Sequence, residues 1–296
     1  MMRLLVLILL VCAAAAAKGG NDKKYVMPWM CLEICNSPEE IQKQLKTIHE
    51  KSHILSGVSF EKYTLGSRCE LVTNHTLTPI TKNDLGPLDS WPLISSYPHY
   101  PEFITWFRSV IFSEECSTTF IDQAVSEAKS NGYTGYNLDW EPVWSEGGGH
   151  ELPLTERDAQ QYARFIDKFA KKLHDEGFKL GVDVASWSSG NGAPPVWDYN
   201  AISSTAVDKV ISMSTYTSND DSFSTELTKL MDAFGTDRAG VGLMTVNASD
   251  NQPLSMQEFE YRFNLIKESG AKEVDVWAMP IPDTLWMFLE RFVAGE

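Results

Sequence analysis

The sequence predicts a single α/β domain folded as a closed (β/α)8 barrel, also called a TIM barrel. Eight strand-like apolar runs alternate along the chain with helical patterns, and this alternation calls for a parallel sheet. The chain has 296 residues, a length at which eight such units favour one closed barrel over an open sheet. No glycine-rich phosphate loop follows the first run, which argues against an open nucleotide-binding sheet.

The predicted strands are short apolar runs bounded by turn residues, as expected for strands buried in a parallel sheet. They are Tyr25–Leu32, His53–Phe60, Trp91–Tyr97, Tyr133–Glu141, Lys179–Trp187, Lys209–Tyr216, Ala239–Val246 and Glu273–Met279.

Helices are predicted between most of these strands from capping residues and from apolar side chains that repeat every three to four residues. Ser37 and Glu40 form a capping box with Pro38 at the first helical position, and Ser255 with Glu258 forms another. The remaining predicted helices run through Phe120–Ala128, from Thr155 to Gly177 and from Asp283 to Val293. Turn residues between Cys69 and Cys116 obscure the second and third units.

The first 17 residues have the three parts of a secretory signal peptide: Arg3, an apolar run from Leu4, and small residues ending at Ala17. The apolar run is short for a membrane span, so cleavage is favoured over a retained signal anchor. Residues 18–296 then form the barrel domain, and no later stretch is apolar enough to cross a membrane. We expect a secreted or lysosomal protein, in agreement with glycosylation acceptor triplets at Asn74 and Asn247.

The chain is acidic, with 25 basic and 40 acidic side chains and a formal net charge of −15 at pH 7. This charge repels nucleic acid and anionic lipid, so we expect neither nucleic acid nor, after signal removal, a membrane as partner. The charge suits a neutral substrate without identifying it. We expect a monomer without a cofactor.

Four cysteines remain once Cys12 leaves with the signal peptide. An even number in an oxidising compartment predicts two disulfides, for which three connectivities are open. A zinc site is not favoured, because the close pair has no second pair or histidine cluster near it, and we expect no metal. The four cysteines are Cys31, Cys35, Cys69 and Cys116.

The stretch GYTGYNLDWEP, residues 132–142, carries the chemistry of the predicted site. Alternation along a strand points one set of side chains toward the helices and the other toward the barrel axis. The outward set is Tyr136, Leu138 and Trp140, and the inward set is Asn137, Asp139 and Glu141.

Two inward carboxylates on one buried strand are costly unless they have partners or shifted pKa values. A buried salt-bridge network is the structural alternative. Active sites of (β/α)8 barrels, however, lie at the C-terminal ends of the strands. Glu141, at that end, is therefore the leading candidate for an acid catalyst.

The stretch Thr134–Pro142 resembles the strand-4 signature of glycoside hydrolase family 18, the chitinases and their relatives, written D-G-x-D-x-D-x-E. Gly135, the last acidic pair and the spacing match. Tyr216, in Met-Ser-Thr-Tyr, sits where the family has its strand-6 tyrosine, and Trp277, in Val-Asp-Val-Trp, where it has its strand-8 tryptophan.

The resemblance implies substrate-assisted retaining hydrolysis of β-linked N-acetylglucosamine, in which the 2-acetamido group of the sugar is the nucleophile. It implies that Glu141 is the acid and base, and that Asp139 orients the acetamido group. Tyr216 would donate a hydrogen bond to that group, and Trp277 would form the floor under the sugar. Core packing is the alternative for Trp277, and an ordinary tyrosine at the barrel end for Tyr216.

Two further residues of the fifth predicted strand are candidates for substrate binding. In GVDVASW, Asp183 has the parity of an inward polar residue and Trp187 that of an aromatic at the barrel end. A structural role is the alternative for Asp183. Trp144 and His150, in the following loop of the fourth unit, are plain loop residues or line a subsite.

The chain departs from the family pattern in several places. Thr134 and Asn137 replace two of the usual aspartates, and an asparagine at position 137 can hydrogen-bond Asp139 but cannot share a proton with it or repel it. Asparagine in this motif resembles the lysosomal chitobiase branch, and Ser214 stands where many members have methionine. The segment between the seventh and eighth strands is too short for the α+β insertion of many chitinases. A shallower groove suits chito-oligosaccharides or the N-glycan core as well as chitin.

Two other functions stay open. A chitinase-like lectin binds such sugars without cleaving them. Those proteins typically lose the catalytic glutamate, whereas this chain retains it as Glu141. A glycosidase with two enzyme carboxyls needs a second carboxylate at a strand end, for which Glu33 and Glu61 are the candidates.

Overall fold

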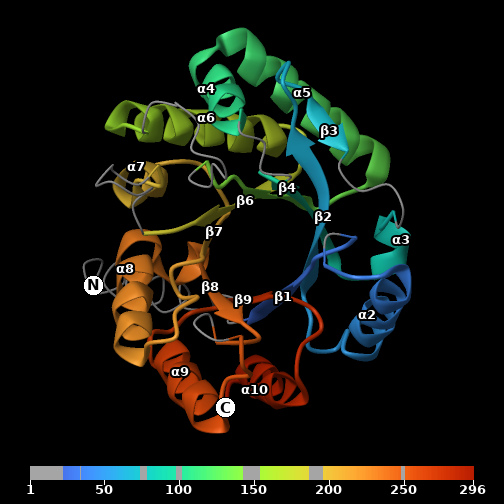
Figure 1. Cartoon of the computed structure of the whole chain (residues 1–296), viewed down its shortest axis with the longest axis vertical. Helices are drawn as coiled ribbons and strands as arrows, with labels where there is room; N and C mark the ends of the chain where they lie inside the picture. Colours follow the sequence, from blue (N-terminus) through green and yellow to red (C-terminus); the bar gives the residue numbers. More distant parts are fainter. Residues whose placement is uncertain are drawn as a thin grey trace, which may run out of the picture.

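Eight parallel strands close into a barrel with helices around it, as predicted (Figure 1). The computed structural model describes residues 23–33, 35–73, 79–97, 102–142, 154–186, 196–247 and 251–296. Neighbouring strands follow the order β1-β9-β8-β7-β6-β5-β4-β2, and β1 pairs with β2 to close the ring. The barrel strands are β1 Tyr25–Met30, β2 Gly57–Leu65, β4 Asp89–Ser95, β5 Gly135–Asp139, β6 Lys179–Val184, β7 Lys209–Ser212, β8 Ala239–Met244 and β9 Glu273–Trp277.

The helices fill the connections between the strands. The predicted capping boxes are present, with Ser37 and Ser255 each accepting from the backbone N–H three residues on, that of Glu40 and that of Glu258. The helices are α2 Pro38–Glu50, α3 Lys82–Leu85, α4 Phe103–Phe112, α5 Glu114–Asn131, α6 Glu156–His174, α7 Tyr199–Ser203, α8 Asp220–Arg238, α9 Met256–Glu268 and α10 Asp283–Ala294.

The strand and helix pattern is obscured in the second and third units because these units contain irregular elements. β2 continues past the predicted end at Phe60 and forms a hairpin with a short antiparallel strand, β3 (Leu71–Thr73), which lies outside the barrel. The next helix, α3, has only 4 residues. A helix of one turn leaves no periodic apolar pattern to detect.

Several strands are shorter than predicted at their C-terminal ends. The predicted runs to Glu141, Trp187 and Tyr216 end at Asp139, Val184 and Ser212. The prediction of these ends was wrong because the apolar pattern continues into the loops. There the backbone no longer forms hydrogen bonds with the neighbouring strand.

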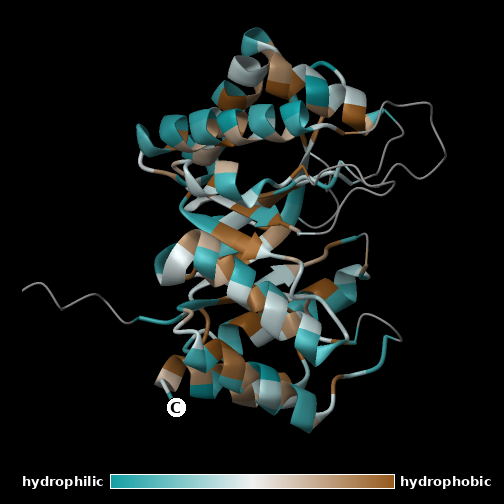
Figure 2. Ribbon diagram, turned by 90° about the vertical axis from the view of Figure 1, so that its left-hand side faces the viewer, coloured by the Kyte–Doolittle hydropathy of each residue, from teal (hydrophilic) through white to brown (hydrophobic). Residues whose placement is uncertain are grey.

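The apolar side chains form two separate sets, one outside the strands and one inside the ring. The outer set packs the strands against the helices, and Figure 2 shows hydrophobic strands with helices of mixed hydropathy around them. The inner set, Met27, Trp29, Trp91 and Ile211, fills the barrel itself. The barrel is thus a packed core, as in other barrels of this kind.

The N-terminal end of the barrel interior holds a buried ion pair. Lys209 on β7 pairs with Glu273 on β9, and its Nζ lies 3.3 Å from the ring centroid of Tyr25 and 4.5 Å from that of Trp91. These contacts compensate the charge of a lysine that is 7% exposed. Charged groups at this end are therefore explained by structure.

Two disulfides are present, as predicted, and the fold selects the pairing. Cys31 joins Cys35 in the loop after β1, and Cys69 joins Cys116, tying the β2–β3 hairpin to α5. Between β8 and β9 the described residues contain α9 and no additional sheet, in line with the missing α+β insertion. None of the described helices combines the length and apolar character that a membrane span requires.

Candidate active site

Strand β5 directs different side chains to its two faces. On the outer face, Trp140 stacks on Phe165 of α6 with ring centroids 5.2 Å apart. On the inner face, Asn137 donates from Nδ2 to the Oγ of Ser59 on β2 over 3.3 Å. This arrangement agrees with the alternation predicted from the sequence, and it places Asp139 inside the barrel.

Asp139 lies among other carboxyl groups at the C-terminal end of the barrel. It is 7% exposed, and its pKa is raised well above the ordinary value. Burial is the largest cause, followed by the negative charges of Glu141 and Glu61. Carboxyl groups from β2 and β5, which are not neighbours in the sheet, therefore act on one another.

Asp183 on β6 extends this group of acids across the barrel. Its pKa is raised by burial, then by Asp139, by Asp275 on β9 and by Glu141, while the amide of Asn137 opposes the rise. Four strands thus contribute acidic side chains to one interior region. The side chain of Asp183 faces inward, as its parity in the sequence predicted.

Glu141 lies two residues beyond the end of β5, where the strand opens into a loop. Its backbone N–H donates to the Oγ of Ser96, over 3.3 Å, and Ser96 directly follows β4. The residue is half-buried, and its charge raises the pKa of Asp139 and Asp183. Glu141 is therefore close to the other acids and remains partly accessible to solvent.

Tyr216 lies four residues beyond β7, and its hydroxyl is buried without a hydrogen bond to any described residue. Burial raises its pKa, followed by Asp183, Asp275, Asp139 and Glu141. The hydroxyl is therefore a neutral donor close to these four acids.

Gly242 on β8 makes room for the Tyr216 ring. A β-carbon on Gly242 would lie 2.7 Å from Cε1 of Tyr216 and would also meet the backbone oxygen of Ser212. Thr215 fixes the turn, because its Oγ1 donates to that oxygen, 2.8 Å away, or to the oxygen of Gly242, 2.7 Å away. The absent side chain at Gly242 is a condition for the position of Tyr216.

Trp277 ends β9 on the inner side of the barrel. Its ring meets that of Trp29 on β1 edge to face, with centroids 5.0 Å apart. The residue is half-buried and packs against the inner apolar set. One portion of the side chain thus packs in the barrel, and another portion stays accessible. Trp187, Trp144 and His150 lie outside the described residues.

Sequence reasoning missed three residues of this site or left their place open. Asp275 has inward parity two positions before Trp277, a signal that was available but not used. Glu61 was noted only as an alternative carboxylate, and no pattern in the sequence links it to Asp139. Gly242 is detectable only from the packing around it.

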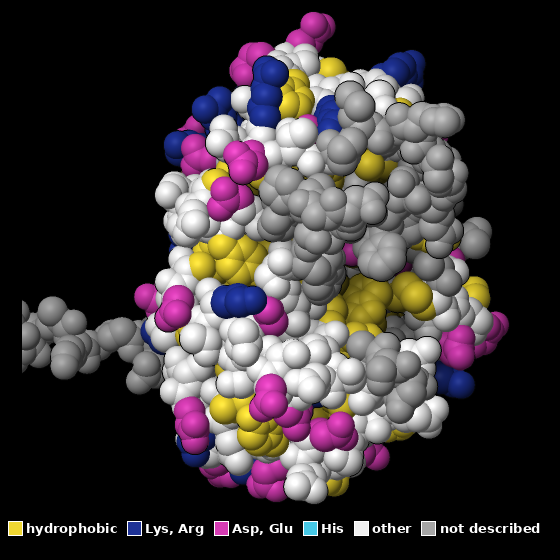
Figure 3. All heavy atoms as spheres, turned by 60° about the vertical axis from the view of Figure 1, so that its left-hand side comes forward, with side chains coloured by type: hydrophobic (Ala, Val, Ile, Leu, Met, Phe, Trp, Pro, Cys, Tyr) yellow, Lys and Arg dark blue, Asp and Glu magenta, His cyan; other side chains and the backbone are white. Residues whose placement is uncertain are grey.

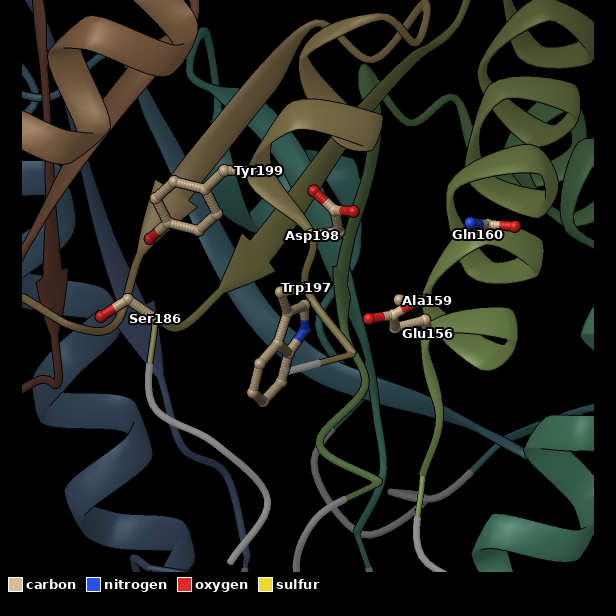
Figure 4. Close-up of a pocket in the computed structure, with 7 residues that line it drawn as sticks. All are labelled: Glu156, Ala159, Gln160, Ser186, Trp197, Asp198 and Tyr199. Carbon is tan, nitrogen blue, oxygen red and sulfur yellow. The ribbon is translucent and has the colours of Figure 1, made fainter. Parts of the chain in front are cut away.

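A cavity of about 320 Å³ lies outside the barrel strands, between α6 and α7. Figure 4 shows Trp197 between Ser186 on one side and Ala159 with Glu156 on the other. The lining is completed by Gln160, Asp198 and Tyr199. Among the described residues, none of the acids around Asp139 lines this cavity.

Figure 3 shows acidic side chains scattered over the visible face rather than gathered in one patch. Within the described ranges, no three His, Cys, Asp or Glu side chains are arranged to hold a metal ion.

Comparison with solved structures places this geometry in a known fold. A chitinase from Chromobacterium violaceum superposes with a TM-score of 0.70 at 13% identity, covering 92% of this chain and 99% of that one. The spore cortex-lytic enzyme SleL from Bacillus megaterium has a TM-score of 0.69 at 12% identity, covering 92% and 75%. A class V chitinase from Nicotiana tobaccum, in complex with NAG4, has 0.66 at 12% identity, covering 92% and 99%.

The chain has the fold of a chitinase catalytic barrel. The predicted resemblance to family 18 is thereby confirmed for the fold. No protein-family model matches the chain, and no curated protein matches it. At these identities the chitinase fold does not by itself assign roles to the side chains, so the catalytic assignments rest on the geometry above.

Proposed function

We propose that the protein is a glycoside hydrolase that cleaves β-linked N-acetylglucosamine by substrate-assisted retaining catalysis. One observation carries the proposal: Glu141, Asp139 and Tyr216 come together at the C-terminal end of a barrel with the chitinase fold. Substrates of this class are chitin, chito-oligosaccharides or the N-glycan core. The complex of the Nicotiana tobaccum chitinase with NAG4 supports an oligosaccharide as partner.

Glu141 acts as the general acid and then as the base. Its half-buried carboxyl protonates the glycosidic oxygen, and the carboxylate formed later takes a proton from the incoming water. Glu141 and Asp139 interact at close range, because the charge of Glu141 raises the pKa of Asp139.

Asp139 and Tyr216 act on the 2-acetamido group. The carbonyl oxygen of that group attacks the anomeric carbon, which places positive charge on the acetamido nitrogen. The carboxylate of Asp139 balances this charge, and the hydroxyl of Tyr216, which has no partner among the described residues, donates to the same group. Trp277 forms the apolar floor under the sugar. Asp183 and Asn137 lie deeper in the barrel than the sugar and help to hold Asp139 in place.

The chitinase-like lectin is less favoured because the chain keeps Glu141 and an inward Asp139. The two-carboxyl glycosidase is supported by one observation, namely that Glu61 lies close enough to raise the pKa of Asp139. We favour substrate assistance because Glu141, Asp139 and Tyr216 match the residues that the resemblance to family 18 assigns to it, whereas Glu61 matches none of them.

Secretion, or delivery to a lysosome-like compartment, is part of the proposal. The two disulfides fit an oxidising compartment. The signal peptide, residues 1–17, and the acceptor Asn74 lie outside the described residues, whereas Asn247 lies just after β8. We propose that residues 18–296 are the mature, monomeric domain.

Two paired substrates test the mechanism. Turnover is measured on a chito-oligosaccharide and on its counterpart with plain 2-hydroxyl groups, and a high-mannose glycopeptide defines the substrate by product masses. The 2-acetamido substrate should react and the 2-hydroxyl one should bind with little reaction, because it lacks the attacking atom. Similar kcat values for the pair would reject substrate assistance, and binding without turnover on all substrates would favour the lectin.

A further inference from the structure

Glu61 is held inside the barrel at the C-terminal end of β2. The register between β2 and β4 shifts between Glu61 and Tyr63, so the strand bulges directly after Glu61. Such bulges redirect side chains and are common near active sites. The backbone N–H of Leu32, in the loop after β1, donates to Oε2 of Glu61 over 3.3 Å. The carboxyl group is therefore both buried and fixed.

The hydrogen bond between Asn137 and Ser59 indicates that Glu61 lies at the level of Asp139 in the barrel interior. The hydrogen bond from Asn137 to Ser59 sets those two residues at one level of the interior. The two strands run in the same direction, and inward positions recur every second residue. Two positions further along both strands are Asp139 and Glu61, which form the next level.

The residue on β5 that precedes Asp139 on the inner face is neutral. Asn137 contributes no charge, and its Nδ2 donates to the Oγ of Ser59. The resemblance to family 18 implies an aspartate at this position, so this chain lacks one expected carboxylate next to Asp139. A carboxylate from β2 is present at the level of Asp139 instead.

We propose that Glu61 is a positioning residue that sets the charge state of Asp139, in place of the carboxylate that Asn137 lacks. The role of Asp139 in catalysis rests on the proposed function, but the interaction between the two carboxyl groups does not. Glu61 touches no reacting atom in this proposal and acts only through Asp139.

The groups that act on Glu61 and Asp139 are acidic or neutral. Burial and Glu33, in the loop after β1, raise the pKa of Glu61 to about 7 against the opposing N–H of Leu32. Asp139 is faced by Glu61, by Glu141 beyond β5 and by Asp183 on β6. The hydroxyls of Tyr162 on α6 and Tyr216 after β7 also face it.

Two carboxyl groups in such a site lose their protons in separate steps. Ionisation of one disfavours ionisation of the other, so the pair holds one proton at pH values where isolated carboxyls would both be charged. In the proposed reaction, this proton decides whether Asp139 is available to balance positive charge on the acetamido nitrogen.

The interaction is tested without substrate by the titration of Asp139. Carbon-13 NMR of protein labelled at the aspartate carboxyl carbons follows each group, and the Asp139 signal is identified by its loss in Asp139→Asn. In the full-length protein we expect a two-step curve. In Glu61→Gln we expect the step that Glu61 contributes to disappear and the midpoint to fall by about one pH unit, as removal of a like charge at close range predicts, while the interaction with Glu141 remains.

Two further variants make the test specific. Glu127→Gln is the matched control, because Glu127 on α5 accepts a hydrogen bond from Tyr63 at 2.7 Å on the outer face of the same strand. It should leave the Asp139 titration unchanged. Glu61→Asp keeps the charge but withdraws it by one methylene, so the midpoint should fall by a smaller amount; this variant decides the question if Glu61→Gln does not fold.

An unchanged Asp139 titration in the folded Glu61 variants would overturn the proposal, whatever the activity. Where turnover is measurable, the acid limb of the kcat/KM profile of Glu61→Gln should move to lower pH by the same amount as the NMR midpoint. Absence of turnover on every glycan would count against the proposed function and would leave the titration result standing.

Discussion

Asn137 on β5 donates a hydrogen bond to Ser59 on β2 across the inside of the barrel, past the intervening strand β4. The bond is 3.3 Å long and is buried. It joins two neutral groups directly below a level that contains Asp139 and Glu61. A neutral residue at position 137 thus limits the number of charges that the barrel interior has to hold.

Asn137→Asp should destabilise the protein and alter its pH profile. A new carboxyl beside Asp139 and Asp183 is costly to ionise, so we expect a loss on the order of 1 to 3 kcal/mol near pH 7 that shrinks in acid. The acid limb of turnover should move to higher pH. Urea unfolding at pH 7 and in acid measures the loss of stability, with Ser59→Ala as a control that removes the hydrogen bond without adding charge. Equal losses at pH 7 and in acid would contradict the electrostatic explanation.

Glu141→Gln should remove turnover while leaving oligosaccharide binding within a few-fold. Loss of a general acid and base costs on the order of 100- to 10,000-fold in rate. Initial rates and calorimetric binding measure the two effects. Glu156→Gln, which alters a carboxyl at the start of α6 that is not among the acids around Asp139, is the matched control and should keep its rate. Turnover unchanged in Glu141→Gln would exclude Glu141 as the catalyst.

Gly242→Ala should displace Tyr216. The added β-carbon meets backbone at Ser212 and lies 2.7 Å from the tyrosine ring, so the ring or the strand has to move, at about 1 to 3 kcal/mol. We expect kcat to fall along with stability. Gly181→Ala on β6 is the control, because its nearest contact, Oδ1 of Asn137, is 3.4 Å away. Equal effects of the two substitutions on kcat would argue against the role of Tyr216.

The protein should lose stability as pH rises from acid to neutral. The pKa of Glu61 is raised from 4.5 to about 7 in the folded state, so its contribution is present below about pH 4.5 and is lost as pH rises through about 7. For this group alone the loss is roughly 3 kcal/mol. Glu61→Gln should therefore unfold with a flatter pH dependence and be more stable than the unaltered protein at about pH 8. Urea midpoints that rise over this range would refute the assignment.

The Cys69–Cys116 disulfide should stabilise the fold more than Cys31–Cys35. The first closes a sequence separation of 47 residues and the second one of 4. Restriction of the unfolded chain predicts losses of about 4 and about 2 kcal/mol when each pair is replaced by alanine. Denaturant unfolding of the two double variants gives the comparison, and mass measurement before and after reduction checks that all four cysteines are oxidised. Four thiols in the unreduced protein would contradict both the pairing and the secretion proposal.

The sequence by itself determined the architecture and the direction of the main side chains. Alternating strand and helix patterns predicted the closed barrel, and a side-chain period of two placed Trp140 outside and Asp139 inside. These features depend on residues close together in the chain, so local patterns carry them. The capping boxes at Ser37 and Ser255 were predictable for the same reason.

Only the tertiary structure decided which distant residues meet. Glu61 precedes Asp139 by 78 positions in the chain, and only the closed barrel brings the two carboxyls together. Closure of the ring likewise chose Cys116 as the partner of Cys69 and set Tyr216 against Gly242. Such contacts follow from strand register and packing, which no short stretch of sequence contains.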